Sequence, residues 1–142
     1  MFKGVHHVAY LVEDLDAATH LFVNVLGAAP LDRKYFDPSG VEVAVVRLGN
    51  VRFELVRPLR EGTPPYEHLR LHGPGFYHIG LEVDEIGDAL AKLKAAGIGL
   101  IDEAPVPGVD WDVAWLQTAS TLGVPSQLVQ PKEGRRETPG GA

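Results

Sequence analysis

The pattern of apolar and polar positions along the chain occurs twice. Residues 4–18 read GVHHVAYLVEDLDAA and residues 75–89 read GFYHIGLEVDEIGDA. The two stretches superpose at a spacing of 71 residues (78 − 7), which places His7 opposite His78. Such self-similarity predicts a chain built from two related structural units.

The ends of the two repeats match as well. Residues 53–58 read FELVRP and residues 126–131 read SQLVQP, at a spacing of 73 residues (127 − 54). Glu54 and Gln127 are therefore counterparts. A repeat whose beginnings and ends both match favours two complete half-units over a chance similarity.

Each half begins with a stretch typical of a strand and continues with one typical of a helix. Residues 5–12 and 76–83 are rich in β-branched and aromatic side chains, which favour strands. Asp14 and Asp84 follow, and we expect each to cap the N-terminus of a helix that in the second half ends at Gly97. The apolar positions at helical spacing are Leu15, Ala18, Phe22 and Val25, and then Ile86, Ala89, Leu90 and Leu93.

Further strands complete each half. Gly49-Asn50 is a dipeptide typical of a tight hairpin, and β-branched runs lie on both sides of it. The expected strands are residues 30–35, 41–48 and 51–56 in the first half, and residues 99–103, 112–117 and 126–129 in the second. The sequence therefore predicts an α+β fold in which each half is a strand, a helix and then more strands.

The chain has the length of one domain. We expect a domain at residues 1–131, with halves at 4–58 and 75–131 and a linker at 59–74 that contains a short helix at 66–72. Residues 132–142 are polar, contain Gly and Pro and lack periodicity, so we expect a disordered tail.

Composition narrows the classes of function. The 142 residues contain no cysteine, so any metal must be held by imidazole, carboxylate or amide groups. A formal net charge of −6 offers no positive field for a nucleic acid. No apolar stretch approaches the roughly 18 residues that a membrane span needs, and no signal peptide is visible, so a cytoplasmic protein is expected.

Strand parity indicates which polar residues share a face. Side chains alternate between the two faces of a strand, so His7 and His78 lie opposite the apolar residues that a helix would cover. Glu54 and Gln127 likewise lie opposite their apolar neighbours. If the helices pack on one side, all four side chains face the other. Two imidazoles, a carboxylate and an amide suit a borderline divalent ion such as Co, Ni, Zn, Mn or Fe.

These segments resemble the vicinal oxygen chelate superfamily, and within it methylmalonyl-CoA epimerases and the glyoxalase relatives. The resemblance covers residues 4–131 and is carried by HHVAYLVEDLDAA, GVEVAVVRLGNVRFELVRPL and GPGFYHIGLEVDEIGDALAKLKAAGIGLIDEAP. It implies an α+β fold of two pseudo-symmetric βαβββ units, which form a curled sheet around a metal cavity. It also implies metal ligands at His7, Glu54, His78 and Gln127.

The chain departs from the epimerase pattern at one implied ligand. Epimerases carry a glutamate at the position of Gln127, where it is implicated in proton transfer. An amide cannot abstract a proton, so Glu54 becomes the implied catalytic carboxylate. Some epimerases have glutamine at the position of Glu54, so this chain would hold the same ligand set reflected across the pseudo-twofold axis.

A second departure lies in the stretch GVDWDVAW, residues 108–115, where epimerases carry a Gly-rich stretch with His. Asp110 and Asp112 would repel the phosphates of CoA, while Trp111 and Trp115 suit an apolar or planar ligand. The tryptophans could equally belong to the core or to an interface.

Other polar residues have simpler interpretations. His6 has the opposite parity to His7 and is expected to be structural. Glu42 and Glu82 could serve as auxiliary bases, although exposed carboxylates at a strand edge fit the pattern as well. The remaining histidines, His20, His68 and His72, are expected to be solvated.

The leading hypothesis is a metal-dependent isomerase, epimerase or lyase that transfers a proton next to the carbonyl of a small-molecule substrate. An Fe(II) dioxygenase is an alternative, because two histidines and a glutamate also describe its facial triad. A non-catalytic small-molecule-binding protein of the same fold is another. A homodimer is expected, with neither nucleic acid nor membrane as a partner.

Overall fold

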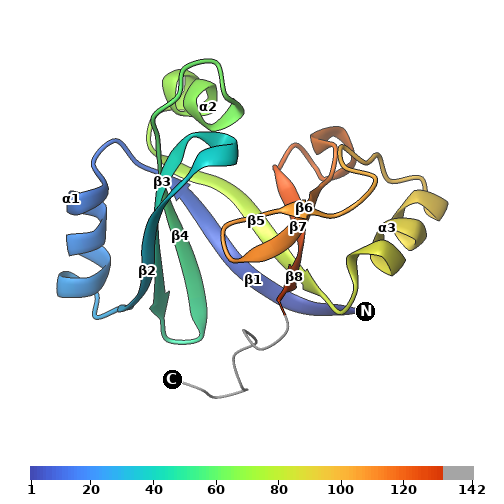
Figure 1. The fold of residues 1–142 in the computed structure, drawn as a ribbon, viewed down its shortest axis with the longest axis horizontal. Helices are drawn as coiled ribbons and strands as arrows, with labels where there is room; N and C mark the ends of the chain where they lie inside the picture. The colour runs from blue at the N-terminus through green and yellow to red at the C-terminus, as the bar shows by residue number, and fades with distance from the viewer. Residues whose placement is uncertain (133–142) are drawn as a thin grey trace. The chain divides into compact units, whose positions relative to one another are not determined.

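The computed structural model, which describes residues 1–132, contains two units with the same order of elements (Figure 1). One unit comprises residues 7–77, and the other comprises residues 1–6 together with the described residues from His78 onward. The division runs through strands β1 (Phe2–Leu11) and β5 (Gly75–Val83). We call the unit of residues 7–77 the first unit and the other the second unit.

Four strands of the first unit form a sheet in the order β2-β3-β4-β1. Strands β1 and β4 are parallel, and the other neighbours are antiparallel. After β1 the elements are α1 (Leu15–Thr19), a π-helical turn η1 (His20–Val25), β2 (Ala29–Phe36), a 3₁₀ turn η2 (Asp37–Ser39), β3 (Val41–Leu48), β4 (Val51–Pro58) and α2 (Pro64–His72).

The second unit repeats this order with shorter strands. Its sheet runs β5-β8-β7-β6, with β5 and β8 parallel. After β5 come α3 (Ile86–Ala95), β6 (Val106–Pro107), β7 (Trp111–Trp115), a 3₁₀ turn η3 (Thr118–Ser120) and β8 (Ser126–Pro131). The predicted α+β class with two βαβββ units is confirmed.

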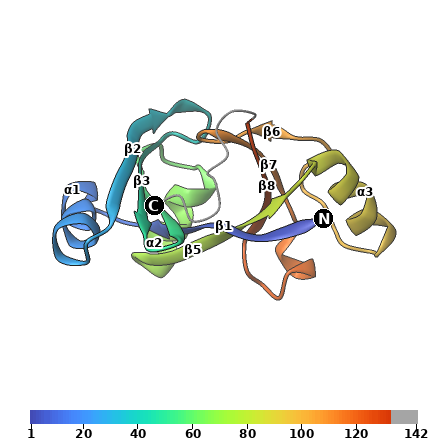
Figure 2. The same cartoon turned by 90° about the horizontal axis from the view of Figure 1, so that it is seen from below.

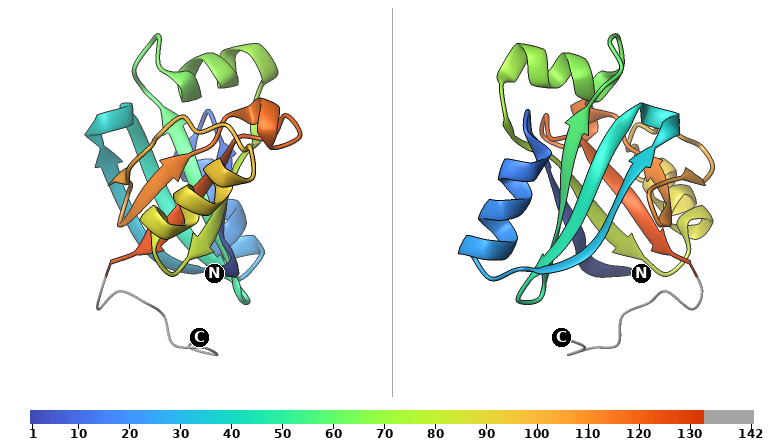
Figure 3. Two further views of the ribbon diagram at one scale, coloured as in Figure 1. Left: turned by 90° about the vertical axis from the view of Figure 1, so that its right-hand side faces the viewer. Right: turned by 60° about the vertical axis from the view of Figure 1, so that its left-hand side comes forward.

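Each unit packs its helix on one face of its sheet. In the first unit α1 lies beside the strands that it covers (Figure 2), and Leu15 and Phe22 pack against Ala44, Val46 and Leu55. In the second unit α3 lies across β7 and β8 (Figure 3, left). There Val83, Ile86, Ala89, Leu90, Ala114, Leu116 and Leu128 form the core. In both units this leaves the opposite face of the sheet for other side chains.

One predicted helix cap is confirmed and the other is wrong. Asp14 caps α1 and accepts a hydrogen bond from the Ala17 amide at 3.0 Å. At α3 the cap is Glu85 rather than Asp84, and the Glu85 carboxylate accepts hydrogen bonds from the amides of the first helical turn. Asp84 instead forms an ion pair with Lys3, 3.2 Å away, which the local pattern does not reveal.

The strand predicted at residues 99–103 is also wrong. Only an isolated bridge joins Leu100 to Leu116, and the pairing strand is β6, further along the chain. The Asp102 carboxylate accepts a hydrogen bond from the Trp115 amide at 2.8 Å. A side chain thus takes up a backbone donor that a regular ladder would use, so no strand forms here.

The segment between the halves contains the expected helix. Helix α2 begins at Pro64, two residues before the predicted start, because Pro64 and Pro65 are well suited to the first helical positions. Among residues 1–132 no helix has the length and apolar character that crossing a bilayer requires. The predicted tail at 132–142 lies outside the described residues, apart from Lys132.

Candidate metal-binding residues

His7 and Glu54 lie on the neighbouring parallel strands β1 and β4 of the first unit, where Ala9 pairs with Glu54. Both residues are buried. They lie on the face opposite Tyr10 and Phe53, which pack with the helix-side core. The strand register therefore brings an imidazole and a carboxylate together on the face that the helix does not cover.

The distance between these two side chains suits a shared ion better than a hydrogen bond. His7 Nε2 and Glu54 Oε2 are 3.6 Å apart, beyond the usual range of an N–H···O bond. Two ligands bound to one ion at about 2.0–2.2 Å lie about 3.0–3.5 Å from each other. The donor types and their separation both fit a borderline divalent ion.

His78 and Gln127 occupy the corresponding places in the second unit. Gly80 of β5 pairs with Gln127 of β8, which is the counterpart of the Ala9–Glu54 pairing in the first unit. Both side chains are buried, on the face opposite Val83 and Leu128 of the α3 core. Burial lowers the pKa of the His78 imidazole to about 3, so this ring is neutral at pH 7 and able to act as a ligand.

Trp111 and Trp115 share this face of the second unit. The ring of Trp115 meets the His78 ring edge to face, with 4.8 Å between centroids, and Trp111 meets His6 in the same way at 4.5 Å. Asp112 lies between them on β7 and faces the opposite side, because side chains alternate along a strand. An aromatic wall therefore flanks His78, and the Asp112 carboxylate does not contribute to it.

The two auxiliary bases suggested by the sequence differ in position. Glu42 has the parity of Ala44 and Val46, which pack against α1, and its carboxylate lies 3.3 Å from Arg33. It therefore faces away from Glu54. Glu82 has the parity of His78 and remains on the ligand face.

Two arginines, Arg47 and Arg52, also lie on the ligand face of the first unit, and the sequence pattern did not predict a functional role for them. Arg47 and Arg52 pair across β3 and β4, and Arg52 has the parity of Glu54. Arg52 is two residues from Glu54 on the same face of β4, and Arg47 lies beside Arg52 on β3, so positive charge lies close to the Glu54 carboxylate. Strand parity together with the hairpin at Gly49-Asn50 was the signal that could have identified this pair.

His6 and the other histidines can now be placed. His6 is buried against Trp111, consistent with the structural role expected for it. His20 and His72 are exposed, as expected for solvated side chains. His68 is half-buried, which departs from that expectation.

Comparison with known proteins gives consistent matches over most of the chain. A model of the Glyoxalase/Bleomycin resistance protein/Dioxygenase superfamily matches residues 6–115. The ethylmalonyl-CoA/methylmalonyl-CoA epimerase of Cereibacter sphaeroides is 40% identical over 101 residues, 68% of this chain and 73% of that protein. The mitochondrial methylmalonyl-CoA epimerase of Bos taurus is 34% identical over 128 residues, 89% of this chain and 73% of that protein.

A solved structure shares the fold. The methylmalonyl-CoA epimerase from Mycobacterium tuberculosis superposes with a TM-score of 0.88 at 24% sequence identity. The match covers 92% of this chain and 89% of that one. Both proteins therefore have the same fold.

The burial of neutral His78 predicts a specific pH dependence for the metal-free protein. An unfolded histidine takes up a proton near pH 6.5, whereas the pKa of folded His78 is about 3. Between these values the unfolded state binds more protons, so each unit of falling pH lowers the free energy of unfolding by about 1.4 kcal/mol. Urea denaturation at pH 7, 6 and 5 should show this slope reduced in His78→Gln. Equal slopes in the two proteins would contradict the neutral, buried state of His78.

Proposed function

The chain belongs to the Glyoxalase/Bleomycin resistance protein/Dioxygenase superfamily, and from this premise we propose that it is a metal-dependent epimerase. The reaction is proton transfer at the carbon next to a carbonyl group. The family resemblance seen in the sequence is confirmed by the family match and by the epimerase relatives. The relatives are epimerases of methylmalonyl-CoA and ethylmalonyl-CoA, which are thioesters. We therefore propose that the carbonyl group of this chain's substrate belongs to an acyl thioester.

The proposed ligands of the metal are His7, Glu54, His78 and Gln127. The observation that carries the proposal is that His7 and Glu54 are buried on adjacent parallel strands with their donor atoms 3.6 Å apart, close to the separation of two ligands of one ion. Gln127 would complete the shell with its amide oxygen. A set of nitrogen and oxygen donors without thiolate suits Co, Ni, Zn, Mn or Fe.

The protein's own residues divide the chemistry between them. A divalent ion bound by these residues supplies Lewis acidity to the substrate carbonyl and so favours loss of the neighbouring proton. Glu54 accepts that proton, since it contributes the carboxylate of the proposed shell, and a second proton donor on the opposite side of the planar enolate completes the inversion. Gln127 has no basic atom and only orients the bound group. Trp115, beside His78, walls the substrate region and excludes water.

The structure reduces the electrostatic repulsion that the acidic stretch at residues 108–115 was expected to exert on the phosphates of CoA. Asp112 lies on the face away from Trp111 and Trp115. On the ligand face of the first unit, Arg47 and Arg52 carry positive charge that could pair with a carboxylate on the acyl group of the substrate. These features support an anionic thioester.

We expect His7→Ala and His78→Ala each to lose most of the bound metal while keeping the fold. The reason is that both imidazoles are direct ligands in the proposal, and the apolar cores on the helix faces do not include them. Metal content of protein purified without added metal, together with circular dichroism, measures both effects. His20→Ala, an exposed histidine on η1, is the matched control.

Two results of this metal analysis would contradict the proposal. Full metal occupancy in His7→Ala or His78→Ala would show that the ligand set is wrong. Iron accompanied by oxygen uptake would indicate a dioxygenase instead, and parent protein that binds no metal would indicate a small-molecule-binding protein.

We expect Glu54→Gln to reduce proton exchange at the substrate α-carbon by about a hundredfold to ten-thousandfold, the usual effect of removing a general base. The amide keeps an oxygen ligand but cannot accept the proton. The measurement is solvent-deuterium incorporation into methylmalonyl-CoA by NMR, with excess metal present. Gln127→Glu is the matched variant and should retain or gain activity. Exchange by Glu54→Gln at the parent rate would transfer the role of base to another group, with Glu82 the next candidate.

The proposal also includes a homodimer. Large apolar side chains remain exposed on the described residues, among them Phe2, Val5 and Phe76, and pairing of two chains would cover such surface. Sedimentation equilibrium at micromolar concentration should give twice the chain mass of 15.4 kDa. A single-chain mass would rule out the homodimer.

A further inference from the structure

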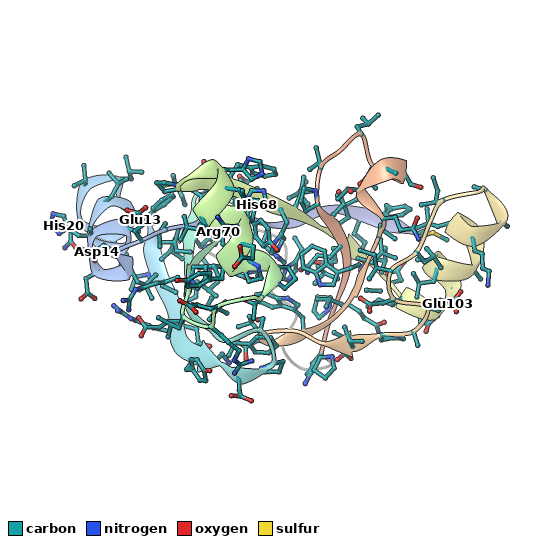
Figure 4. The ribbon with its side chains drawn as sticks, turned by 90° about the horizontal axis from the view of Figure 1, so that it is seen from above. Glu13, Asp14, His20, His68, Arg70 and Glu103 are labelled. Carbon is teal, nitrogen blue, oxygen red and sulfur yellow. The ribbon has the colours of Figure 1, made fainter. Side chains whose placement is uncertain are left out.

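Helix α2 carries two histidines one helical turn apart. His68 and His72 are separated by four residues, so their side chains project from the same face of the helix. Their rings lie 4.4 Å apart between centroids, at an interplanar angle of 45°. Figure 4 shows His68 and Arg70 on this helix. Neither histidine belongs to the ligand set proposed for the epimerase.

The spacing of the two rings is close to that of a chelating pair. Imidazoles bound through nitrogen to one ion at about 2.1 Å place their ring centroids about 4.5–5.3 Å apart. The observed centroid distance of 4.4 Å lies just below this range. Histidines at this helical spacing form a known arrangement for zinc binding.

Neighbouring groups restrict the orientation of the His68 ring and favour the neutral form that binds a metal ion. Its ring meets Tyr77 edge to face, with 4.9 Å between centroids, so packing restricts the imidazole. Its Nδ1 atom is buried and has no hydrogen-bond partner within residues 1–132. Burial first, and then the nearby His72, lower the pKa of His68, which favours the neutral form that a metal requires. His72 is exposed, which leaves an approach from solvent.

The adjacent charges do not compete for these rings. Glu67 is the nearest acid along the helix, and its carboxylate lies 2.7 Å from Arg70. This pair holds the carboxylate toward the next turn.

We propose that His68 and His72 form a second metal site, which takes a borderline divalent transition ion through one nitrogen of each imidazole. The other coordination positions remain open to water or to an anionic ligand. An ion held here links two successive turns of α2 and stabilises the end of the helix. The site is independent of the proposed epimerase chemistry.

The experiment uses Ni²⁺ alone as the probe, with the double variant His7→Ala/His78→Ala as the starting protein. Calorimetric titration of this protein at pH 7 should show one binding event per chain. Adding His72→Gln or His68→Gln should weaken it by about tenfold or more, since the loss of even an outer-shell partner can cost that much. The matched control is His20→Gln, on η1 at the far end of the same unit (Figure 4), which should leave binding unchanged.

A second measurement covers the case in which the double variant does not fold. In the unmodified protein, small amounts of Cu²⁺ should broaden the imidazole proton signals of His68 and His72 together, and before those of His20. Broadening of His20 first, or of His72 without His68, would overturn the proposal. Titration curves of the double variant that do not change with His72→Gln would overturn it as well.

Discussion

The burial of His7 beside Glu54 is the constraint on which the proposed chemistry depends. Placing an imidazole and a carboxylate on the inside of adjacent parallel strands is costly unless their polar atoms find partners. Their donor atoms face each other at 3.6 Å, a separation too long for a good hydrogen bond and close to that of two ligands of one ion. The first unit therefore keeps a polar pair where apolar side chains would stabilise the fold more simply.

The second unit has the same parallel strand pairing, but a neutral amide takes the place of the carboxylate. The same parallel register brings Gln127 to the position that Glu54 holds in the first unit. An amide is less costly to bury than a carboxylate, and it carries neither negative charge nor a basic atom. The proposed shell consequently has one carboxylate, and its position decides from which side a proton is removed. Two units with related folds can in this way contribute different groups to the proposed shell.

In each sheet the apolar core lies on one face and the proposed ligands lie on the other, so the buried polar groups do not interrupt the core that stabilises the fold. The helices bury apolar residues on one face, and these cores contain none of the four proposed ligands. Substitution of a ligand is therefore expected to affect chemistry more than folding. The aromatic contact between Trp115 and His78 adds a restraint on the imidazole without a further charged group.

The sequence alone determined the features that depend on local periodicity. The repeat and the alternation along each strand were sufficient to predict two related units, each with a strand, a helix and further strands, the helix-covered faces, and the common face of His7 and Glu54, because neighbours along a strand alternate by geometry. Contacts between distant segments decided the rest. Glu85 caps α3 while Asp84 turns to Lys3, Asp102 replaces a strand by bonding the Trp115 amide, and Glu42 turns to Arg33. Each of these polar groups had more than one possible partner, and only the tertiary structure brings the chosen partner within hydrogen-bonding or ion-pairing distance.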